Sequence, residues 1–503
     1  MHPMPQAVKA RRFSIFRLLL LGILISPPLL VGGAAVNFNL LGFASVEGDA
    51  AYGSRRAGGT SGGAGGAHVQ VWTTADLVKY LQTNSTLMVE IMTNLNLSSL
   101  SNHSGGFPAD YPTGEILVRS NKTIYSKNGS TISRGTLRIG KPSLGAQQNV
   151  IVRNLKFRDL WVLDPTGNYD TYGWDYIHLE QSSHHVWVDH CDFERVYDGM
   201  LDLTHGCDFV TASWNIFRSQ KKCSLIGHSD TNQLEDTNHL NVTYHHNWFT
   251  DVEERMPRMR FGNAHVFDEY CESLGGKGIQ STCGAATLVE NCYFYHPNAG
   301  TYPTIEANGG PTGTVKVVDS LIVNLPGNNV TFRQFGATNF SFNWPFAGAA
   351  PPYPYPLDPV AEVPALVTNY AGVGKVGFEL WQMEQFTSAQ LTNAAISGPG
   401  ATPAGDGVAN FVKYARGLPP FAVASPPLTF LRLEPPDAVL VYRRPANATD
   451  VNYHAQSSSD LAAWTESGVT QQLVSTDVNG LQTWEVRCQP SGSEAFLRLV
   501  LDR

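Results

Sequence analysis

The 503-residue sequence has few charged side chains and no excess of basic ones. Charged residues make up 16% of the chain, and the formal net charge at pH 7 is −8 with a pI near 6.0. A protein that binds nucleic acid through its general surface carries surplus Lys and Arg, so this balance argues against nucleic acid as a partner and against a polybasic membrane patch. A basic site on this acidic chain therefore has to arise from local clustering.

The sequence also lacks cysteine pairs with metal-ligand spacing. None of the seven cysteines forms a C-x-x-C pair, which excludes the usual sequence pattern of a zinc site. Cys271 and Cys283 bracket a glycine-rich stretch and are the best disulfide candidate. Seven cysteines fit an exported protein in which only some thiols are paired. The cysteines in strand-like runs are expected to be buried free thiols: Cys191, Cys207, Cys223 and Cys292.

No uninterrupted apolar run is long enough to span a bilayer comfortably. Three basic residues precede an apolar stretch from Phe13 to Ile25, which Arg17 interrupts, and small residues follow at 32–35. A spanning helix needs about 20 apolar residues, whereas a basic segment with a short apolar core is typical of an export signal. We therefore expect residues 1–35 to be a cleaved signal peptide, with an uncleaved membrane anchor as the alternative.

Between about residue 115 and 345 the sequence has no convincing amphipathic helix. It consists of short strand-like runs that resemble one another, usually with Asn at the third or fourth place and an aromatic residue shortly after. Such a repeat is typical of a parallel β-helix, in which Asn would stack on Asn and Phe on Phe at about 4.8 Å. A β-sandwich is the alternative, but it would not repeat Asn-x-Phe in this way. The clearest copies are 152–157, 188–193, 212–217, 244–249 and 289–294.

Three arginines lie within six positions in the stretch Glu254 to Gly262. Arg stays charged in nearly any site, so clustered guanidinium groups repel one another unless an anion lies between them. Pro257 favours extended backbone, and the alternation beyond it would turn positions 259 and 261 toward a core and Arg258 and Arg260 toward solvent. The stretch predicts a site for a polyanionic ligand, with surface salt bridges to neighbouring glutamates as the alternative.

Two upstream stretches have related patterns. After Lys222 the sequence alternates so that Cys223 and Leu225 would face inward. Further upstream, Asp202 stands between two leucines and therefore points away from the core, and Asp198 precedes a glycine at a bend. Two outward carboxylates near one turn suit a hard cation with oxygen ligands. The alternative is a solvated turn with one exposed aspartate.

Together these stretches resemble polysaccharide lyase family 1, the Ca2+-dependent pectate lyases. Val186 to Cys191 matches the family's vWiDH signature, and Arg255-x-Pro257-x-x-Arg260 matches its RxPxxR signature. A matching block from Lys222 to Gly227 stands between them in the family's order, and the resemblance runs from about residue 41 to about residue 375. It implies an all-β fold, a right-handed single-stranded parallel β-helix.

The resemblance implies calcium as the cofactor. Asp175, Asp198 and Asp202 would be its ligands, and its charge would stabilise the carboxylate next to the carbon that loses a proton. One further carboxylate of the family falls near Gly173, so this chain departs from the four-acid pattern. We therefore expect calcium binding to depend partly on the carboxylates of the substrate.

The resemblance also implies the substrate and the reaction. Polygalacturonate, the α-1,4-linked backbone of pectin, would be cleaved by β-elimination to 4,5-unsaturated oligogalacturonides. Lys222 and Arg260 would bind substrate carboxylates, and Arg255 would abstract the proton at C5. An Arg base is physically awkward, because general bases work best when their pKa lies near the operating pH. The mechanism therefore predicts activity that rises well above neutrality.

Two other functions remain open from the sequence. A calcium-independent pectin lyase shares the fold but lacks the metal-binding carboxylates and lines its cleft with aromatic residues. A non-catalytic β-helix that binds polysaccharide would not need Arg255 or Lys222, and both are present. For the favoured function we expect a secreted monomer with no stable membrane insertion after signal cleavage.

The expected organisation has three parts: the signal peptide at 1–35, the β-helix at 36–375 and a β-rich accessory module at 376–503. A strand followed by a helix from near Thr74 would cap the first coils, and a proline-rich tail at 351–371 would close the domain. In the module, residues 402–410 resemble a calcium loop that lacks its first two acidic positions, and alternating runs after residue 438 suggest a small β-sandwich.

Overall fold

The chain folds into two compact units, Leu30–Ser388 and Ala389–Arg503 together with Met1–Leu29. The computed structural model describes residues 17–20, 24–25, 30–31, 34–48, 54–272, 278–295, 305–306, 312–323, 329–336, 339–424, 429–489 and 494–503.

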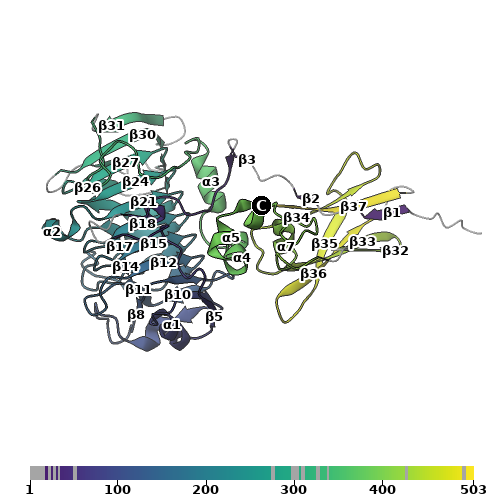
Figure 1. Cartoon of the computed structure of the whole chain (residues 1–503), viewed down its shortest axis with the longest axis horizontal. Helices are drawn as coiled ribbons and strands as arrows, with labels where there is room; N and C mark the ends of the chain where they lie inside the picture. Colours follow the sequence, from purple (N-terminus) through teal and green to yellow (C-terminus); the bar gives the residue numbers. More distant parts are fainter. Residues whose placement is uncertain are drawn as a thin grey trace, which may run out of the picture. The chain divides into compact units, whose positions relative to one another are not determined.

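The first unit is a right-handed parallel β-helix, which confirms the fold expected from the repeats. Each coil pairs in parallel register with the next, so that Val152 lies opposite Val188, Val188 opposite Ala212, and Ala212 opposite Tyr244. Figure 1 shows these strands stacked in the order of the sequence. Residues far apart in the chain therefore become neighbours when they share a place in the repeat.

The strands of this unit form two large sheets. The 19-stranded sheet is parallel throughout except for its last hairpin, β30–β31. Its strands are β5 (Ala67–Val71), β6 (Leu87–Ile91), β7 (Leu95–Asn96), β9 (Lys122–Tyr125), β10 (Thr131–Ser133), β12 (Gln148–Arg153), β13 (Lys156–Arg158), β15 (His184–Asp189), β16 (Asp192–Glu194), β18 (Asp208–Ser213), β19 (Ile216–Lys222), β21 (Asn241–His245), β22 (Trp248–Glu254), β24 (Asn263–Phe267), β25 (Tyr270–Glu272), β27 (Ala286–Glu290), β28 (Tyr293–Tyr295), β30 (Thr314–Val323) and β31 (Asn329–Gly336). The 8-stranded sheet contains β8 (Gly114–Val118), β11 (Gly135–Ile139), β14 (Ile177–Leu179), β17 (Leu201–Leu203), β20 (Leu225–Ile226), β23 (Arg258–Arg260), β26 (Ile279–Thr282) and β29 (Ile305–Glu306).

Aromatic rings stack along the interior of the β-helix. Phe157, Phe193, Phe217 and Phe249 occupy the same place on successive coils, with adjacent ring centroids 4.8, 5.1 and 5.0 Å apart. All four are fully buried. This confirms the expected stacking of Phe on Phe, which makes a shift of one coil against the next costly, because it would break every ring contact at once.

The asparagines of the repeat fall into two adjacent columns rather than one. In one column Asn215 donates from Nδ2 to Asn247 Oδ1 (2.9 Å), and Asn247 donates from Nδ2 to Glu269 Oε1 (2.8 Å). The other column adopts positive φ on successive coils and contains Asn154, His190, Trp214, His246, Asp268 and Asn291. Asn recurs in both columns because it satisfies buried backbone groups in the first and tolerates left-handed backbone in the second.

Helix α1 (Thr74–Leu81) covers the first coils of the β-helix, and the proline-rich tail packs along its outer face. The helix begins where the sequence predicts it, with Thr73 accepting from Asp76 N as the N-cap, and it buries Leu77 and Leu81 against the first coils. The proline-rich tail packs on the outer face through Tyr353. It leads to α3 (Val363–Tyr370) and α4 (Gly377–Gln385). The short elements beside these are η1 (Phe43–Ser45), η3 (Leu97–Leu100) and α2 (Gln233–Asp236).

The second unit combines short helices with antiparallel sheets. Its helices are α5 (Ser388–Leu391), α6 (Ala394–Ser397) and α7 (Asn410–Ala415). One sheet has the order β32 (Thr429–Glu434), β33 (Asp437–Pro445), β36 (Leu481–Cys488) and β35 (Val469–Thr476), and the other pairs β34 (Asn452–Ser458) with β37 (Glu494–Asp502). The expected antiparallel β-structure of this part is therefore present.

The loop that resembles a calcium site holds a lysine instead. Asp406 accepts from Val408 N and Ala424 N, and Lys413 Nζ lies 2.9 Å from Asp406 Oδ2. The lysine is fully buried and also donates to the carbonyl oxygens of residues 420 and 422. An ammonium group tethered to the chain thus supplies the positive charge that calcium would bring.

The expected disulfide between Cys271 and Cys283 is wrong, because both thiols are free. Cys271 fills the place of a phenylalanine in the interior, opposite Phe249 on one coil and Phe294 on the next. Cys283 follows β26 in the other sheet, beside Asp230. The expectation that the cysteines of strand-like runs are buried and free is confirmed.

The segment expected to be a signal peptide lies largely outside the described residues. Its described parts are β1 (Arg17–Leu20) and β2 (Leu24–Ile25), which pair with β37, and the two-stranded hairpin β3 (Leu30–Val31) and β4 (Ala34–Ala35). Among the described residues, no helix is long and apolar enough to cross a membrane. Cleavage of this segment stays a prediction.

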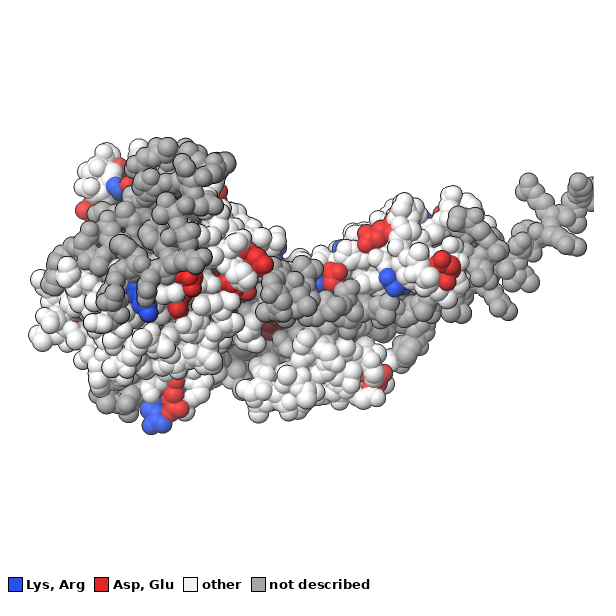
Figure 2. Space-filling model, turned by 90° about the horizontal axis from the view of Figure 1, so that it is seen from above, with Lys and Arg blue, Asp and Glu red and all other residues white. Residues whose placement is uncertain are grey.

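Charged side chains are sparse on the face drawn in Figure 2. Lys and Arg stand apart there, interspersed with Asp and Glu, and form no broad patch of one sign. This agrees with the net charge of −8.

The phenylalanine stack makes a prediction about stability. Phe217→Ala removes the ring that bridges two neighbours, and we expect it to lower the free energy of unfolding of the β-helix by about 3–5 kcal/mol. Leu234→Ala is the matched control, since its side chain is fully exposed and the change should stay within about 0.5 kcal/mol. Calorimetry of both variants measures the effect, and a loss at Phe217 no larger than at Leu234 would contradict the role of the stack.

Candidate active site

The residues singled out by the sequence converge on one face of the β-helix. Asp202 lies in β17, Arg260 ends β23, and the parallel order β14–β17–β20–β23 places these strands on successive coils. His178 in β14 lies opposite Asp202, and Leu225 in β20 lies opposite Arg258. The stacking of coils therefore places on one sheet side chains that are far apart in the sequence, although the contacts of Arg260 are with Asp230 and Gly227 and not with the aspartates.

Asp202 points away from the core, as its alternation with two leucines predicts. Leu201 and Leu203 are fully buried in the interior, whereas Asp202 lies on the opposite side of the strand. It is nevertheless only 5% exposed, and its Oδ1 accepts from Leu225 N at 2.9 Å. The backbone of Gly199 approaches so closely that a Cβ there would lie 2.1 Å from Asp202 Oδ1. A glycine is therefore required at this position for the carboxylate to keep its place.

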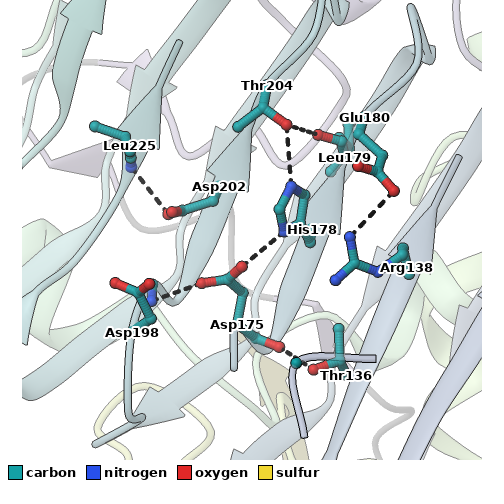
Figure 3. Close-up of polar contacts among 12 residues, drawn as sticks. Thr136, Arg138, Asp175, His178, Leu179, Glu180, Asp198, Asp202, Thr204 and Leu225 are labelled. Carbon is teal, nitrogen blue, oxygen red and sulfur yellow. Dashed lines mark hydrogen bonds and ion pairs between the residues drawn. The ribbon is translucent and has the colours of Figure 1, made fainter. Parts of the chain in front are cut away.

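Asp175 is held by a histidine that sequence reasoning missed. Asp175 Oδ2 lies 2.7 Å from His178 Nδ1, and His178 Nε2 lies 3.0 Å from Thr204 Oγ1 (Figure 3). Asp175 Oδ1 accepts from Gly199 N at 2.7 Å. Burial raises the pKa of Asp175, but these contacts with His178 and Gly199 outweigh it and keep the pKa below its ordinary value. A polar residue flanked by Ile177 and Leu179 was the signal in the sequence, since it repeats the pattern around Asp202.

Asp198 lies in the turn before β17 and is paired with Lys222. Lys222 Nζ lies 3.1 Å from Asp198 Oδ1 and also donates to Tyr169 O at 2.7 Å. Burial and the nearby charge of Asp175 raise the pKa of Asp198 to about 6, although Lys222 and Arg255 act in the opposite direction. The single positive charge of Lys222 does not neutralise the negative charges of both Asp198 and Asp175.

The three aspartates fit a divalent cation with oxygen ligands. Figure 3 shows their carboxylates side by side, with Asp175 between Asp198 and His178. Burial, followed by the charges of Asp175 and Asp198, holds the pKa of Asp202 well above its ordinary value. Uncompensated negative charge of this kind is relieved by a hard cation such as Ca2+. The residues present therefore suit the ion that the sequence implies.

The three aspartates nevertheless do not form a complete set of closely spaced metal ligands. Among the residues that the structure describes, the groups whose ligand atoms all lie within 4.8 Å of one another are two other clusters, at His68 and at His246. At Gly173, where the resemblance places a further carboxylate, an added Cβ would meet nothing within 4 Å. The space for a fourth acidic side chain exists, but this chain leaves it open.

Arg255 lies in the turn between β22 and β23 with a positive φ of 68°. Its side chain is half-buried, its Nε atom is buried without a hydrogen-bond partner, and its charge lowers the pKa of both Asp198 and Asp202. Its backbone oxygen accepts from Ser224 N at 2.9 Å, which ties the turn to the preceding coil. The charge of Arg255 therefore acts on the carboxylate cluster.

Arg260 is not turned to solvent, so that expectation is wrong. It is only 7% exposed, its Nε lies 2.5 Å from Asp230 Oδ1, and its Nη1 donates to Gly227 O at 2.6 Å. The alternation correctly places Met259 in the core, but the loop after β20 folds over the outer side of the strand. That loop is remote in sequence from Arg260, and strand periodicity does not report it.

The inward alternation expected after Lys222 is wrong in part. Cys223 is fully buried, but the chain then turns from β19 into β20, and Ile226 rather than Leu225 enters the core. Two short strands in different sheets replace the single run that the pattern suggested. The turn is what brings Lys222 to the edge of the carboxylate cluster.

Comparison with known proteins adds an independent observation. A family model described as pectate lyase matches residues 40–376. The chain belongs to the pectate lyase family. It is 33% identical over 363 residues to a pectate trisaccharide-lyase of Thermotoga maritima, covering 69% of this chain and 91% of that relative. A pectate trisaccharide-lyase of Bacillus licheniformis is 29% identical over 348 residues, covering 68% of this chain and 88% of the relative.

Solved pectate lyase structures share the fold. One from Paenibacillus sp. 0602 aligns with a TM-score of 0.53 at 24% identity, covering 67% of this chain and 96% of that chain. A thermostable pectate lyase aligns with a TM-score of 0.52 at 21% identity, covering 66% and 96%. Membership of the family makes this chain a polysaccharide lyase, and the shared β-helix is the scaffold of its site.

The contact between Gly199 and Asp202 can be tested by adding one methyl group. Gly199→Ala should displace the Asp202 carboxylate, and we expect the dissociation constant for Ca2+ to rise at least about tenfold because one anionic ligand moves away. Gly173→Ala is the matched control, since a Cβ there meets nothing within 4 Å. Calorimetric titration with Ca2+ measures both, and unchanged affinity in a folded Gly199→Ala protein would exclude Asp202 as a ligand.

Proposed function

We propose that this chain is a calcium-assisted pectate lyase that cleaves α-1,4-linked polygalacturonate by β-elimination. The observation that carries the proposal is the position of Arg255, whose guanidinium group lies close enough to Asp198 and Asp202 to lower the pKa of both. A basic side chain beside a cluster of acidic ones is the arrangement that proton removal next to a carboxylate requires. The product is a 4,5-unsaturated oligogalacturonide.

The bond changes define what the side chains have to do. The proton leaves C5, its electron pair forms the C4–C5 double bond, and the glycosidic oxygen leaves C4 and takes up a proton. Removing the weakly acidic C5 proton builds negative charge on the adjacent carboxylate, so positive charge at that carboxylate lowers the barrier. In its uncharged guanidine form Arg255 takes the C5 proton in this proposal, and water supplies the proton that the leaving glycosidic oxygen takes up. The turn and the contact of its backbone oxygen with Ser224 N hold Arg255 in position.

Asp175, Asp198 and Asp202 would hold the calcium ion. A bound calcium ion supplies the positive charge that stabilises the substrate carboxylate as the proton leaves. His178 orients Asp175 for this role through the 2.7 Å contact to its Oδ2. Because Gly173 contributes no ligand, carboxylates of the substrate would supply the further ligands, and we expect calcium to bind more tightly when polygalacturonate is present.

Lys222 and Arg260 would bind further carboxylates of the substrate. Lys222 is held by Asp198 and by Tyr169 O, and Arg260 by Asp230 and Gly227 O. These contacts keep both cations in place before the substrate arrives. A galacturonate carboxylate would compete for the same hydrogen-bond donors, and bidentate contacts to a carboxylate favour Arg260.

The two other functions make different demands on the site. A calcium-independent pectin lyase has no use for the three aspartates, and activity on polygalacturonate that survives EGTA unchanged would favour it. A non-catalytic binding protein would release no unsaturated product. Ultraviolet absorbance of that product, with and without calcium, separates all three.

The remaining parts of the proposal concern the whole chain. We infer that it is secreted after cleavage of a signal peptide within residues 1–35, and that it acts as a monomer with residues 36–375 as catalytic domain and 376–503 as an accessory module. The net charge of −8 supports a protein that does not act on nucleic acid. Analysis of the mature amino terminus and the mass of the secreted protein tests the signal and the monomer.

Arg255→Lys tests the proposed base. The variant keeps a positive charge but loses the planar guanidinium group and its placement, so turnover should fall by several orders of magnitude while substrate binding persists. Steady-state kinetics with polygalacturonate measures the split between kcat and KM. Near-normal turnover in the folded variant would rule out the role.

Asp202→Asn is the matched variant for the metal. It removes one anionic ligand and leaves Arg255 in place, so its loss of activity should be reversed in part when calcium is raised to millimolar levels. Arg255→Lys should show no such rescue. If calcium restores neither variant although both are folded, Asp202 does not act through the cation.

The raised pKa of Asp198 predicts a calcium-dependent pH profile. Burial and Asp175 hold this pKa at about 6, so the carboxylate gains a proton, and the cation site weakens, as the pH falls through that value. We expect activity at limiting calcium to decline below about pH 6 and to increase into the alkaline range, with the acid limb moving to lower pH as calcium is added. An acid limb of the pH profile that added calcium does not move, or maximal activity in acid medium, would contradict this prediction.

A further inference from the structure

A second cluster of metal-ligating side chains lies outside the catalytic face. His246 and Asp268 occupy the left-handed turns after β21 and β24, on adjacent coils of the 19-stranded sheet (Figure 1). Asp358 reaches them from the proline-rich tail. His246 Nε2 lies 2.9 Å from Asp358 Oδ2 and 3.7 Å from Asp268 Oδ2, and one ligand atom from each residue lies within 4.8 Å of the others.

Asp268 is a buried carboxylate with incomplete hydrogen bonding. Its side chain is 0% exposed, its Oδ2 accepts from Asp358 N at 3.2 Å, and its Oδ1 is buried without a hydrogen-bond partner. A buried, unsatisfied carboxylate oxygen is costly unless something compensates it. The side chain of Asp358 is 26% exposed, which leaves a route from solvent into the cluster.

Another acidic cluster in this chain contains a lysine, and no Lys or Arg takes that place in the described ion pairs of Asp268 and Asp358. Glu90 and Glu384 also lie beside a histidine, but Lys127 Nζ sits 3.0 Å from Glu90 Oε1 and 3.0 Å from Glu384 Oε1. Among the described residues, the ion pairs of Asp268 and Asp358 involve His246 and no Lys or Arg. Burial, followed by the charges of Asp358 and Glu290, holds the pKa of Asp268 well above the ordinary range.

The adjacent histidine allows His246 to present a lone pair to the cluster. His245 Nδ1 lies 3.0 Å from His246 Nδ1, so one N–H bond stands between the two rings. When His246 donates that hydrogen, its Nε2 is unprotonated and faces the two carboxylates. A neutral imidazole whose other nitrogen is hydrogen-bonded is the usual form of a metal-ligating histidine.

We propose that His246, Asp268 and Asp358 bind a divalent cation of the first transition series, with Zn2+ as its simplest representative. One imidazole nitrogen and two carboxylate oxygens suit such an ion better than calcium, which prefers oxygen ligands alone. Ligand atoms around tetrahedral zinc stand about 3.3 Å apart, and the separations of 2.9 and 3.7 Å bracket that value. Water at the solvent side of Asp358 completes the coordination.

The ion joins the tail to the coils. Apart from Asp358, the tail is held by Tyr353 Oη, 2.7 Å from Thr243 Oγ1, and by Tyr355 Oη, which donates to Glu290 Oε2 at 2.6 Å. A metal bound to two coils and the tail adds a cross-link that exists only in the folded state. Binding therefore stabilises the folded protein by a free energy that grows with the logarithm of the ion concentration over its dissociation constant.

The test uses the full chain, stripped of metal and then kept in excess Ca2+ so that the catalytic aspartates are occupied. Zn2+ is titrated by calorimetry and by thermal unfolding, and Co2+ is added separately to give the visible absorption bands of a nitrogen-ligated site. We expect one Zn2+ per chain and a rise in Tm, and at least about a 100-fold loss of Zn2+ affinity in Asp268→Asn. Asn tolerates left-handed backbone and its Oδ1 can accept from Asp358 N, so this variant should fold.

Tyr355→Phe is the matched control. It removes the hydroxyl group that donates to Glu290, supplies no ligand and changes no charge, so its Tm should fall while its Zn2+ affinity stays that of the unaltered chain. His246→Gln and Asp358→Asn should behave like Asp268→Asn. The proposal is overturned if the unaltered chain takes up no Zn2+ beside bound Ca2+, if Asp268→Asn binds Zn2+ equally well, or if Asp268→Asn raises Tm without any metal response, which is the result expected when Asp268 and Asp358 merely share a proton.

Discussion

Register between coils is the constraint on which the rest of this structure depends. Each strand pairs in parallel with the same part of the next repeat, and the buried rings from Phe157 to Phe249 resist any slip between coils. The outward side chains inherit this register. Asp202 faces its partners because Leu201 and Leu203 are packed inside, so the geometry of the site is a consequence of core packing and not of local flexibility.

Short-range periodicity was enough to predict the fold and the inward or outward direction of several site residues. The alternation around Asp202 and the inward position of Met259 were both predictable, because they depend on neighbours one or two positions away. Arg260 was not, since its burial depends on Asp230, which is distant in sequence and lies in a loop. The same limit applies to His178: the alternation with Ile177 and Leu179 turns it outward, but its contact with Asp175 depends on how the chain folds around both residues.

The cysteines show why spacing alone misleads in a coiled repeat. Cys271 and Cys283 are separated by a stretch that suggests a closed loop, yet successive strands of one coil belong to different sheets and face different surroundings. Cys271 takes the place of a ring between Phe249 and Phe294, whereas Cys283 lies near Asp230. Residues close in sequence are thereby separated, while residues one coil apart, such as Phe249 and Cys271 or Cys271 and Phe294, are brought into line.

Stacking also multiplies like charges, and the chain compensates them in different ways. Lys413 is built in beside Asp406, and Lys127 beside Glu90 and Glu384. The catalytic face has Lys222 and Arg255 against three aspartates, which leaves negative charge that only an added cation or a change of protonation can relieve. Asp268 has no such built-in partner among its described ion pairs. In a fold that aligns equivalent positions, each buried carboxylate therefore marks a place where a tethered cation, a bound metal or a proton has to complete the charge balance.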